Sequence, residues 1–205
     1  SLGRIGGQPD ASDEVRKICV SILSQHFVKG NKNTERPYAA LALGLIAFES
    51  EATHVKPKEL KYSLAEMIRK DLRQMKGDKV ALGAQAIALG MIGLREKANV
   101  DLLVKILKDR GLDKKLRGAA SIALGLIGDN AARDAILAAL EEREDRDLRV
   151  DTAVAAGLLG DSSAVDVLVK VLNDATKVSQ FVLGSVALAL GQIGDHRAIE
   201  PLLSL

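Results

Sequence analysis

The side chains that most often bind metals or act as nucleophiles are scarce in this sequence and stand apart from one another. The three histidines, His26, His54 and His196, form no His-x-x-x-His or His-Glu pair, and Cys19 is the single cysteine. A metal site needs several such ligands, and a nucleophile needs a base within reach. The sequence therefore predicts no metal, no cofactor and no catalytic residue.

Pairs of glycines three residues apart recur, at Gly3 and Gly6, Gly90 and Gly93, and Gly125 and Gly128. A phosphate-binding loop needs a preceding strand and a following Lys-Ser or Lys-Thr, and neither is present at these positions. We interpret the second glycine of each pair as the residue that ends a helix.

Carboxylates recur at matching positions of a repeated pattern and could bind a partner. Asp134, Asp166 and Glu200 each lie two residues after an alanine, and Glu142 and Asp174 share a second matching position. On helices stacked about 10 Å apart, these side chains would form an acidic stripe. Two interpretations stay open: a solvated charged face, or a groove for a basic segment of a partner.

Basic residues crowd one turn of the chain. Asp109 and Asp113 interrupt the group, which comprises Lys105, Lys108, Arg110, Lys114 and Lys115. Contact with nucleic-acid phosphates would be sensitive to salt. However, the whole chain has a net charge of only +2, aromatic residues make up 2%, and tryptophan is absent. The platforms on which single-stranded nucleic acid stacks are therefore missing, and we expect weak backbone contact at most.

Six segments in one register organise the chain around these residues. Their first glycines fall at positions 3, 44, 90, 125, 157 and 191, so the spacings are 41, 46, 35, 32 and 34 residues. The segment Ala123-Leu-Gly-Leu-Ile-Gly-Asp129 is representative. Such a period is typical of helical repeats that bury their apolar faces on their neighbours.

Each repeat is predicted to fold as two helices, A and B. One helix A is expected over residues 113–127, with Gly128 left-handed just past its end and Asp129 as the N-cap of helix B. Asp161 and Asp195 repeat the role of Asp129. Helix B then carries apolar residues at four-residue steps, such as Ala132, Ile136 and Leu140.

The glycine inside helix A is unexpected, because glycine costs about 1 kcal/mol against alanine in a helix. Its recurrence predicts a close approach of the neighbouring helix, at which a side chain would not fit. The positions concerned are Gly44, Gly90, Gly125, Gly157 and Gly191.

The pattern resembles HEAT repeats, most closely the short HEAT-like variety named after phycobilisome (bilin) lyases. Residues 116–140 match that variety almost throughout and residues 148–172 nearly so, and the resemblance is strong over 79–205 and loose over 1–78. It implies an all-α fold, a right-handed α-solenoid or α-α superhelix of about five to six helix pairs.

The resemblance also implies a role for two charged columns. In HEAT proteins such columns form Asp–Arg ladders that tie repeats together. Here the cap aspartates Asp129, Asp161 and Asp195 would pair with the arginines eight residues before each repeat's glycine, which are Arg36, Arg117 and Arg149.

We expect one repeat array over residues 1–205, irregular and enlarged over 1–78 and regular over 79–205. Both ends cut through a repeat, so the chain is expected to be a fragment of a longer protein. No stretch reaches the roughly 18 uninterrupted apolar residues of a membrane span. We therefore expect no membrane contact, and a soluble protein, with the cytoplasm favoured.

Several functions are compatible with this pattern. The preferred one is a non-catalytic protein–protein interaction scaffold, whose partner is another protein or another domain of the same protein. An alternative, implied by the resemblance alone, is a subunit like a bilin lyase or isomerase. HEAT-like deoxyhypusine hydroxylases bind iron through His-Glu dyads, and the absence of such dyads argues against that enzyme.

Overall fold

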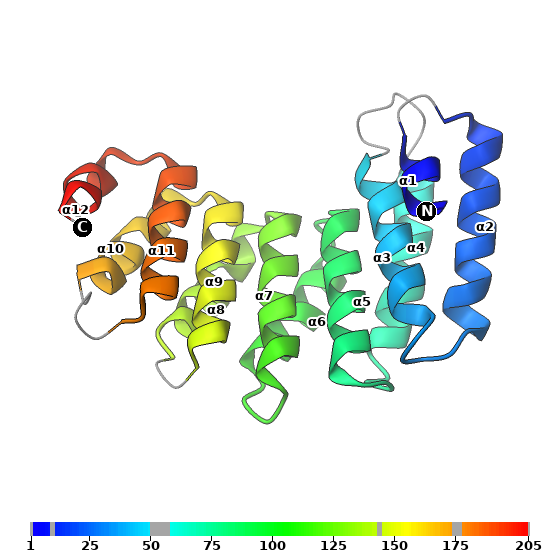
Figure 1. The fold of residues 1–205 in the computed structure, drawn as a ribbon, viewed down its shortest axis with the longest axis horizontal. Helices are drawn as coiled ribbons and strands as arrows, with labels where there is room; N and C mark the ends of the chain where they lie inside the picture. Colours follow the sequence, from blue (N-terminus) through cyan, green and yellow to red (C-terminus); the bar gives the residue numbers. More distant parts are fainter. Residues whose placement is uncertain (1, 9–10, 50–57, 143–144, 174–177, 205) are drawn as a thin grey trace. The chain divides into compact units, whose positions relative to one another are not determined.

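The computed structural model describes residues 2–8, 11–49, 58–142, 145–173 and 178–204. Over these residues every regular element is a helix (Figure 1), which confirms the all-α solenoid. The chain divides into two compact units, Ser1–Leu102 and Leu103–Leu205, and the division falls within helix α6 (Lys97–Lys108). The single array over 1–205 stays a prediction.

The first unit alternates A and B helices. The A helices are α1 (Leu2–Gly7), α3 (Arg36–Glu49) and α5 (Lys79–Ile92), and the B helices are α2 (Asp13–Lys29) and α4 (Lys58–Leu72). α3 packs against both α1 and α5, while α2 packs against α1 and α3. The ends follow from local chemistry: the side chains of Ser12 and Asp78 accept hydrogen bonds from the backbone N–H groups of Val15 and Ala81, which starts α2 and α5.

The second unit repeats this arrangement at a shorter period. Its A helices are α7 (Lys114–Ile127), α9 (Arg146–Leu159) and α11 (Gln180–Ile193), and its B helices are α8 (Arg133–Leu140), α10 (Val165–Asn173) and α12 (Ile199–Leu203). In Figure 1, α7, α9 and α11 lie side by side in one layer, and α8 and α10 lie in a second layer behind them.

The turn from helix A to helix B has the predicted chemistry. Gly128 is left-handed with φ of 69°, as are Gly93, Gly160 and Gly194. The Asp129 side chain accepts a hydrogen bond from the backbone N–H of Ala131 at 2.9 Å. The side chains of Asp161 and Asp195 likewise accept hydrogen bonds from the backbone N–H groups of Ser163 and Arg197. The predicted caps are therefore confirmed. Each cap starts a short 3-10 turn that leads into helix B: η2 (Asn130–Ala132), η3 (Ser162–Ala164) and η5 (His196–Ala198).

Neighbouring A helices meet at the predicted glycines. A Cβ atom on Gly44 would lie 3.0 Å from the Cα of Ala88, and one on Gly157 would lie 2.8 Å from the Cα of Ala189. On Gly125 it would lie 2.7 Å from the carbonyl oxygen of Ala155. No side chain fits at these crossings, so the close approach is confirmed there.

The same prediction is wrong at Gly191. Within 4 Å of a Cβ built there, no atom of the described residues is found. Gly191 is exposed because α11 contacts α9 and α10 but no further A helix among the residues that the structure describes. Gly90 is buried in α5, and the close approach predicted there stays a prediction.

This contrast gives a matched pair of variants. Gly125→Ala should destabilise the protein by about 1–3 kcal/mol, because the added methyl group overpacks the contact with Ala155. Gly191→Ala should stabilise it by up to about 1 kcal/mol, because the helix gains alanine's propensity without a clash. Urea unfolding followed by circular dichroism measures both changes. Shifts of the same sign in the two variants would contradict the close-approach interpretation.

Candidate partner-binding surface

The arginines near the start of the A helices hold the end of the preceding B helix. Arg117 is 2% exposed, and its Nε donates to the carbonyl oxygen of Leu107 at 2.7 Å. Arg149 donates in the same way to Leu140 at 3.0 Å. The last carbonyl groups of a helix lack intrahelical donors and carry partial negative charge, so a guanidinium group there satisfies both needs.

The predicted ladder of cap aspartates and column arginines is therefore wrong for Arg117. Its Nη2 instead donates to Glu142 at 2.8 Å. Arg117 lies in the first turn of α7 and Asp129 follows the end of that helix, so about 18 Å of helix separates them. The cap aspartates pair with other arginines: Asp161 with Arg133 and Asp195 with Arg197.

Glu142 is engaged inside this packing. Its side chain is 19% exposed, and the Nε of Arg110 lies 3.5 Å from the same carboxylate oxygen that Arg117 contacts. The hydrogen bond from Arg117 holds the pKa of Glu142 below its ordinary value. This carboxylate has little room to contact a partner. Asp174, predicted to share its position, lies outside the described residues.

The other three predicted carboxylates face solvent. Asp134 and Asp166 have side chains that are 84% and 77% exposed, and Glu200 is also exposed. Each follows by two residues an alanine that is 2% exposed or less, which fixes the outward direction of the carboxylate. The buried alanines are Ala132, Ala164 and Ala198.

Two arginines link the carboxylates of successive turns. Arg133 contacts Asp134 at 3.0 Å and Asp161 of the next repeat at 3.2 Å. Arg197 contacts Asp166 of the previous repeat at 2.9 Å and donates to the carbonyl oxygen of Ser162 at 2.7 Å. These inter-repeat ion pairs were not predicted, because their partners lie about thirty positions apart in sequence.

The surface formed by these turns remains acidic. We define the acidic turn surface as residues 129–134, 161–166 and 195–200. It contains six carboxylates and two arginines, a net charge of −4 with His196 neutral. Hydrogen bonds from Ser163 hold the pKa of Asp161 below its usual value, and those from Arg197 do so for Asp195. These carboxylates therefore stay charged at neutral pH.

The predicted basic patch is exposed but partly neutralised. Arg110 lies 3.5 Å from Glu142, and the Nζ of Lys114 lies 3.2 Å from Asp145. A phosphate group would compete with these carboxylates. Lys105, Lys108 and Lys115 are also exposed. Nucleic-acid contact at this patch stays a prediction.

In the described part of the chain, no three His, Cys, Asp or Glu side chains gather as metal ligands would. His26 and Glu35 form an exposed pair with Nδ1 and Oε2 3.2 Å apart, which sequence reasoning missed because a turn separates them. Among the helices described, none has the length and apolar run needed to cross a membrane.

One carboxyl group has a strongly perturbed acidity. Asp151 on α9 is half-buried and faces Gly118 on α7, where a side chain larger than hydrogen would collide with it. Burial raises the pKa of Asp151 to about 6, and the nearby charges of Asp147 and Asp145 add to the rise. The raised pKa was not predicted from the sequence, because it arises where two helices pack together.

Comparison with known proteins identifies the repeats of the second unit. The pattern of HEAT repeats matches residues 134–205, and the pattern of the PBS lyase HEAT-like repeat matches residues 116–142. This confirms the predicted HEAT-like type. No curated protein matches the chain.

Among solved structures, human deoxyhypusine hydroxylase in complex with glycerol is similar at 16% sequence identity and a TM-score of 0.46. The match covers 99% of this chain and 87% of that protein. A likeness this distant says nothing of the activity of the present chain.

The acidity of Asp151 predicts a pH-dependent stability. A carboxyl group whose pKa is raised on folding favours the folded state when protonated, so this contribution is complete below about pH 4 and is lost as the pH rises through about 6. Asp151→Asn should therefore stabilise the protein at pH 7, by about 1 kcal/mol after solvent screening of a half-buried group.

The gain should vanish near pH 4, where the parent carboxyl group is also neutral. Thermal unfolding at pH 4 and pH 7 measures the difference, with Asp134→Asn as the control at an exposed carboxylate. An equal effect of Asp151→Asn at both pH values would contradict the interpretation.

Proposed function

Because residues 116–205 carry HEAT-like repeats, we propose that this chain is a non-catalytic protein–protein interaction scaffold that holds a basic partner segment along its helix-B face. A helical repeat array offers an extended surface on which several repeats contact one ligand. The partner is a segment of another protein or of another domain of the same protein.

The observation that carries the proposal is the net charge of the acidic turn surface together with its fixed geometry. Arg133 and Arg197 neutralise only part of its charge, and they hold Asp134 and Asp166 in equivalent positions of successive repeats. Fixed side chains lose less conformational entropy on binding than free ones do. A row of such carboxylates favours lysine or arginine side chains spaced along an extended or helical segment.

The proposal is tested with a fluorescent oligolysine peptide of about eight residues, whose binding to the full chain is followed by anisotropy. Asp134→Asn combined with Asp166→Asn should weaken binding about tenfold, because each exposed charge contributes up to about 1 kcal/mol. Binding by the parent should also weaken between about 50 and 150 mM salt.

Asp147→Asn combined with Asp101→Asn is the matched control. Both carboxylates are exposed and each pairs with a nearby cation, Arg146 and Lys97, so the control removes the same net charge. The control should bind the peptide nearly as well as the parent. Equal loss in the two double variants would mean that only overall charge matters, and would refute the proposed surface.

A further inference from the structure

Basic residues gather at the turns that join B helices to A helices in the first unit. We define the basic turn surface as residues 29–36 and 73–79, which join α2 to α3 and α4 to α5. It contains six basic residues and two carboxylates, a net charge of +4. The whole first unit has sixteen basic and twelve acidic residues, which is also +4. The excess positive charge of this unit is therefore concentrated at these turns.

Hydrogen bonds fix the two turns and join them to each other. In the first turn, the Oδ1 of Asn31 accepts hydrogen bonds from the backbone N–H groups of Asn33 and Thr34, at 2.9 and 3.3 Å. The Oδ1 of Asn33 accepts another from the backbone N–H of Asp78 in the second turn, at 3.1 Å. The cations of both turns therefore lie beside the starts of α3 and α5.

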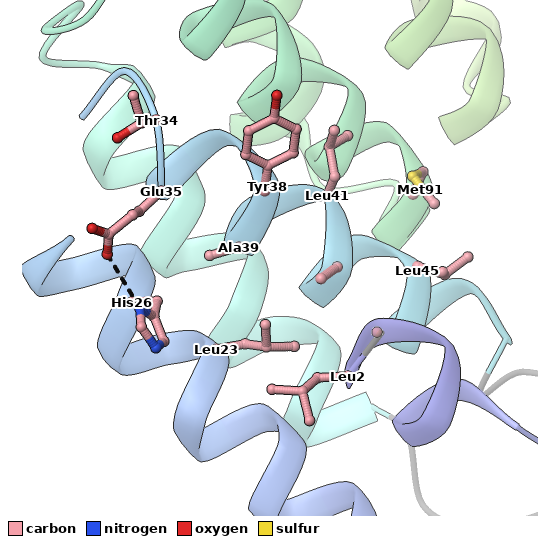
Figure 2. Close-up of a pocket in the computed structure, with 12 residues that line it drawn as sticks. Leu2, Leu23, His26, Thr34, Glu35, Tyr38, Ala39, Leu41, Leu45 and Met91 are labelled. Atoms are coloured by element: carbon pink, nitrogen blue, oxygen red, sulfur yellow. Dashed lines mark hydrogen bonds and ion pairs between the residues drawn. The ribbon is translucent and has the colours of Figure 1, made fainter. Parts of the chain in front are cut away.

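The carboxylates near this surface are engaged with other groups. Glu35 pairs with His26, with Oε2 and Nδ1 3.2 Å apart, and both side chains line the pocket that Figure 2 shows. The Asp78 side chain accepts the hydrogen bond that starts α5. Asp71, just before the second turn, contacts Arg36 at 3.2 Å. These acidic groups therefore do not neutralise the lysines of the turns.

Four side chains of the basic turn surface are exposed and form no ion pair with a described carboxylate. They are Lys29, Lys32, Arg73 and Lys76. The predicted basic patch of the second unit differs, because Arg110 and Lys114 lie against carboxylates there. An anion at the basic turn surface would meet these four cations without displacing an existing partner.

The chemistry of this surface favours the phosphates of a duplex over other anions. Lysine binds phosphate as a point charge, so the contact requires no particular orientation. Neither turn carries an aromatic side chain on which a base could stack, which disfavours a single strand. Neighbouring helices pack about 8–10 Å apart, a span of roughly two or three phosphates along one strand at about 3.4 Å each. Cations from the two turns can therefore contact different phosphates of one strand.

We propose that the basic turn surface binds the phosphate backbone of duplex nucleic acid without reading its sequence. Binding releases counterions from the duplex, so it is sensitive to salt. Contacts to phosphates position a protein on the duplex but carry no sequence information. The site uses no residue of the acidic turn surface, so it goes beyond the protein scaffold and can fail independently of it.

The test uses the full chain and a labelled DNA duplex of about 20 base pairs, with binding followed by anisotropy between about 50 and 200 mM salt. With about four phosphate contacts, the logarithm of the binding constant should fall against the logarithm of the salt concentration with a slope of about −4. Lys32→Gln combined with Lys76→Gln should bring the slope to about −2 and weaken binding about tenfold at the lowest salt. A duplex of unrelated sequence should bind equally well.

Lys17→Gln combined with Lys97→Gln is the matched control. Both lysines are exposed and lie in the first unit but outside the basic turn surface, so the control removes the same charge. Its salt slope and affinity should stay close to those of the parent. Circular dichroism should show unchanged helicity in both double variants, because all four substituted side chains are exposed.

Several results would overturn the proposal. Absence of duplex binding at about 50 mM salt would remove it, and equal loss in the two double variants would mean that only net charge matters. Equally tight binding of an oligoglutamate peptide of matched charge would assign the surface to an acidic protein. Stronger retention on phosphatidylserine vesicles at the same salt would assign it to a membrane surface.

Discussion

The close approach of neighbouring A helices is the constraint on which the rest of the structure depends. Gly44, Gly125 and Gly157 leave space for the backbone of the next helix, so the spacing between repeats is set by main-chain contact. Close packing of this kind tolerates little change in volume. The arginine contacts and the cap turns recur at equivalent positions because this spacing recurs.

That constraint also separates the roles of the two helices in a pair. The A helices pack on one another through alanine, glycine and leucine, which leaves few of their positions free to contact a partner. The carboxylates Asp134 and Asp166 lie at the start of B helices in the second unit, where they remain exposed.

Features that depend on a few neighbouring residues could be predicted from the sequence. The left-handed Gly128 and the cap Asp129 follow from local backbone chemistry, and both are confirmed. The partner of Arg117 could not be predicted, because Glu142 lies 25 positions away and the recurring aspartates suggested a different pairing. Gly191 has the same motif as its counterparts, but among the described residues no helix approaches it closely.

The arginines that hydrogen-bond to the ends of the B helices indicate how the protein folds. The Nε of Arg117 reaches a carbonyl group only ten positions back, and its other contact lies one repeat ahead. A chain whose contacts join residues this close in sequence has a low contact order, so the loss of entropy on loop closure adds little to the folding barrier. Each unit should accordingly fold rapidly from any helix pair that forms first, and should fray from its outermost helices when it begins to unfold.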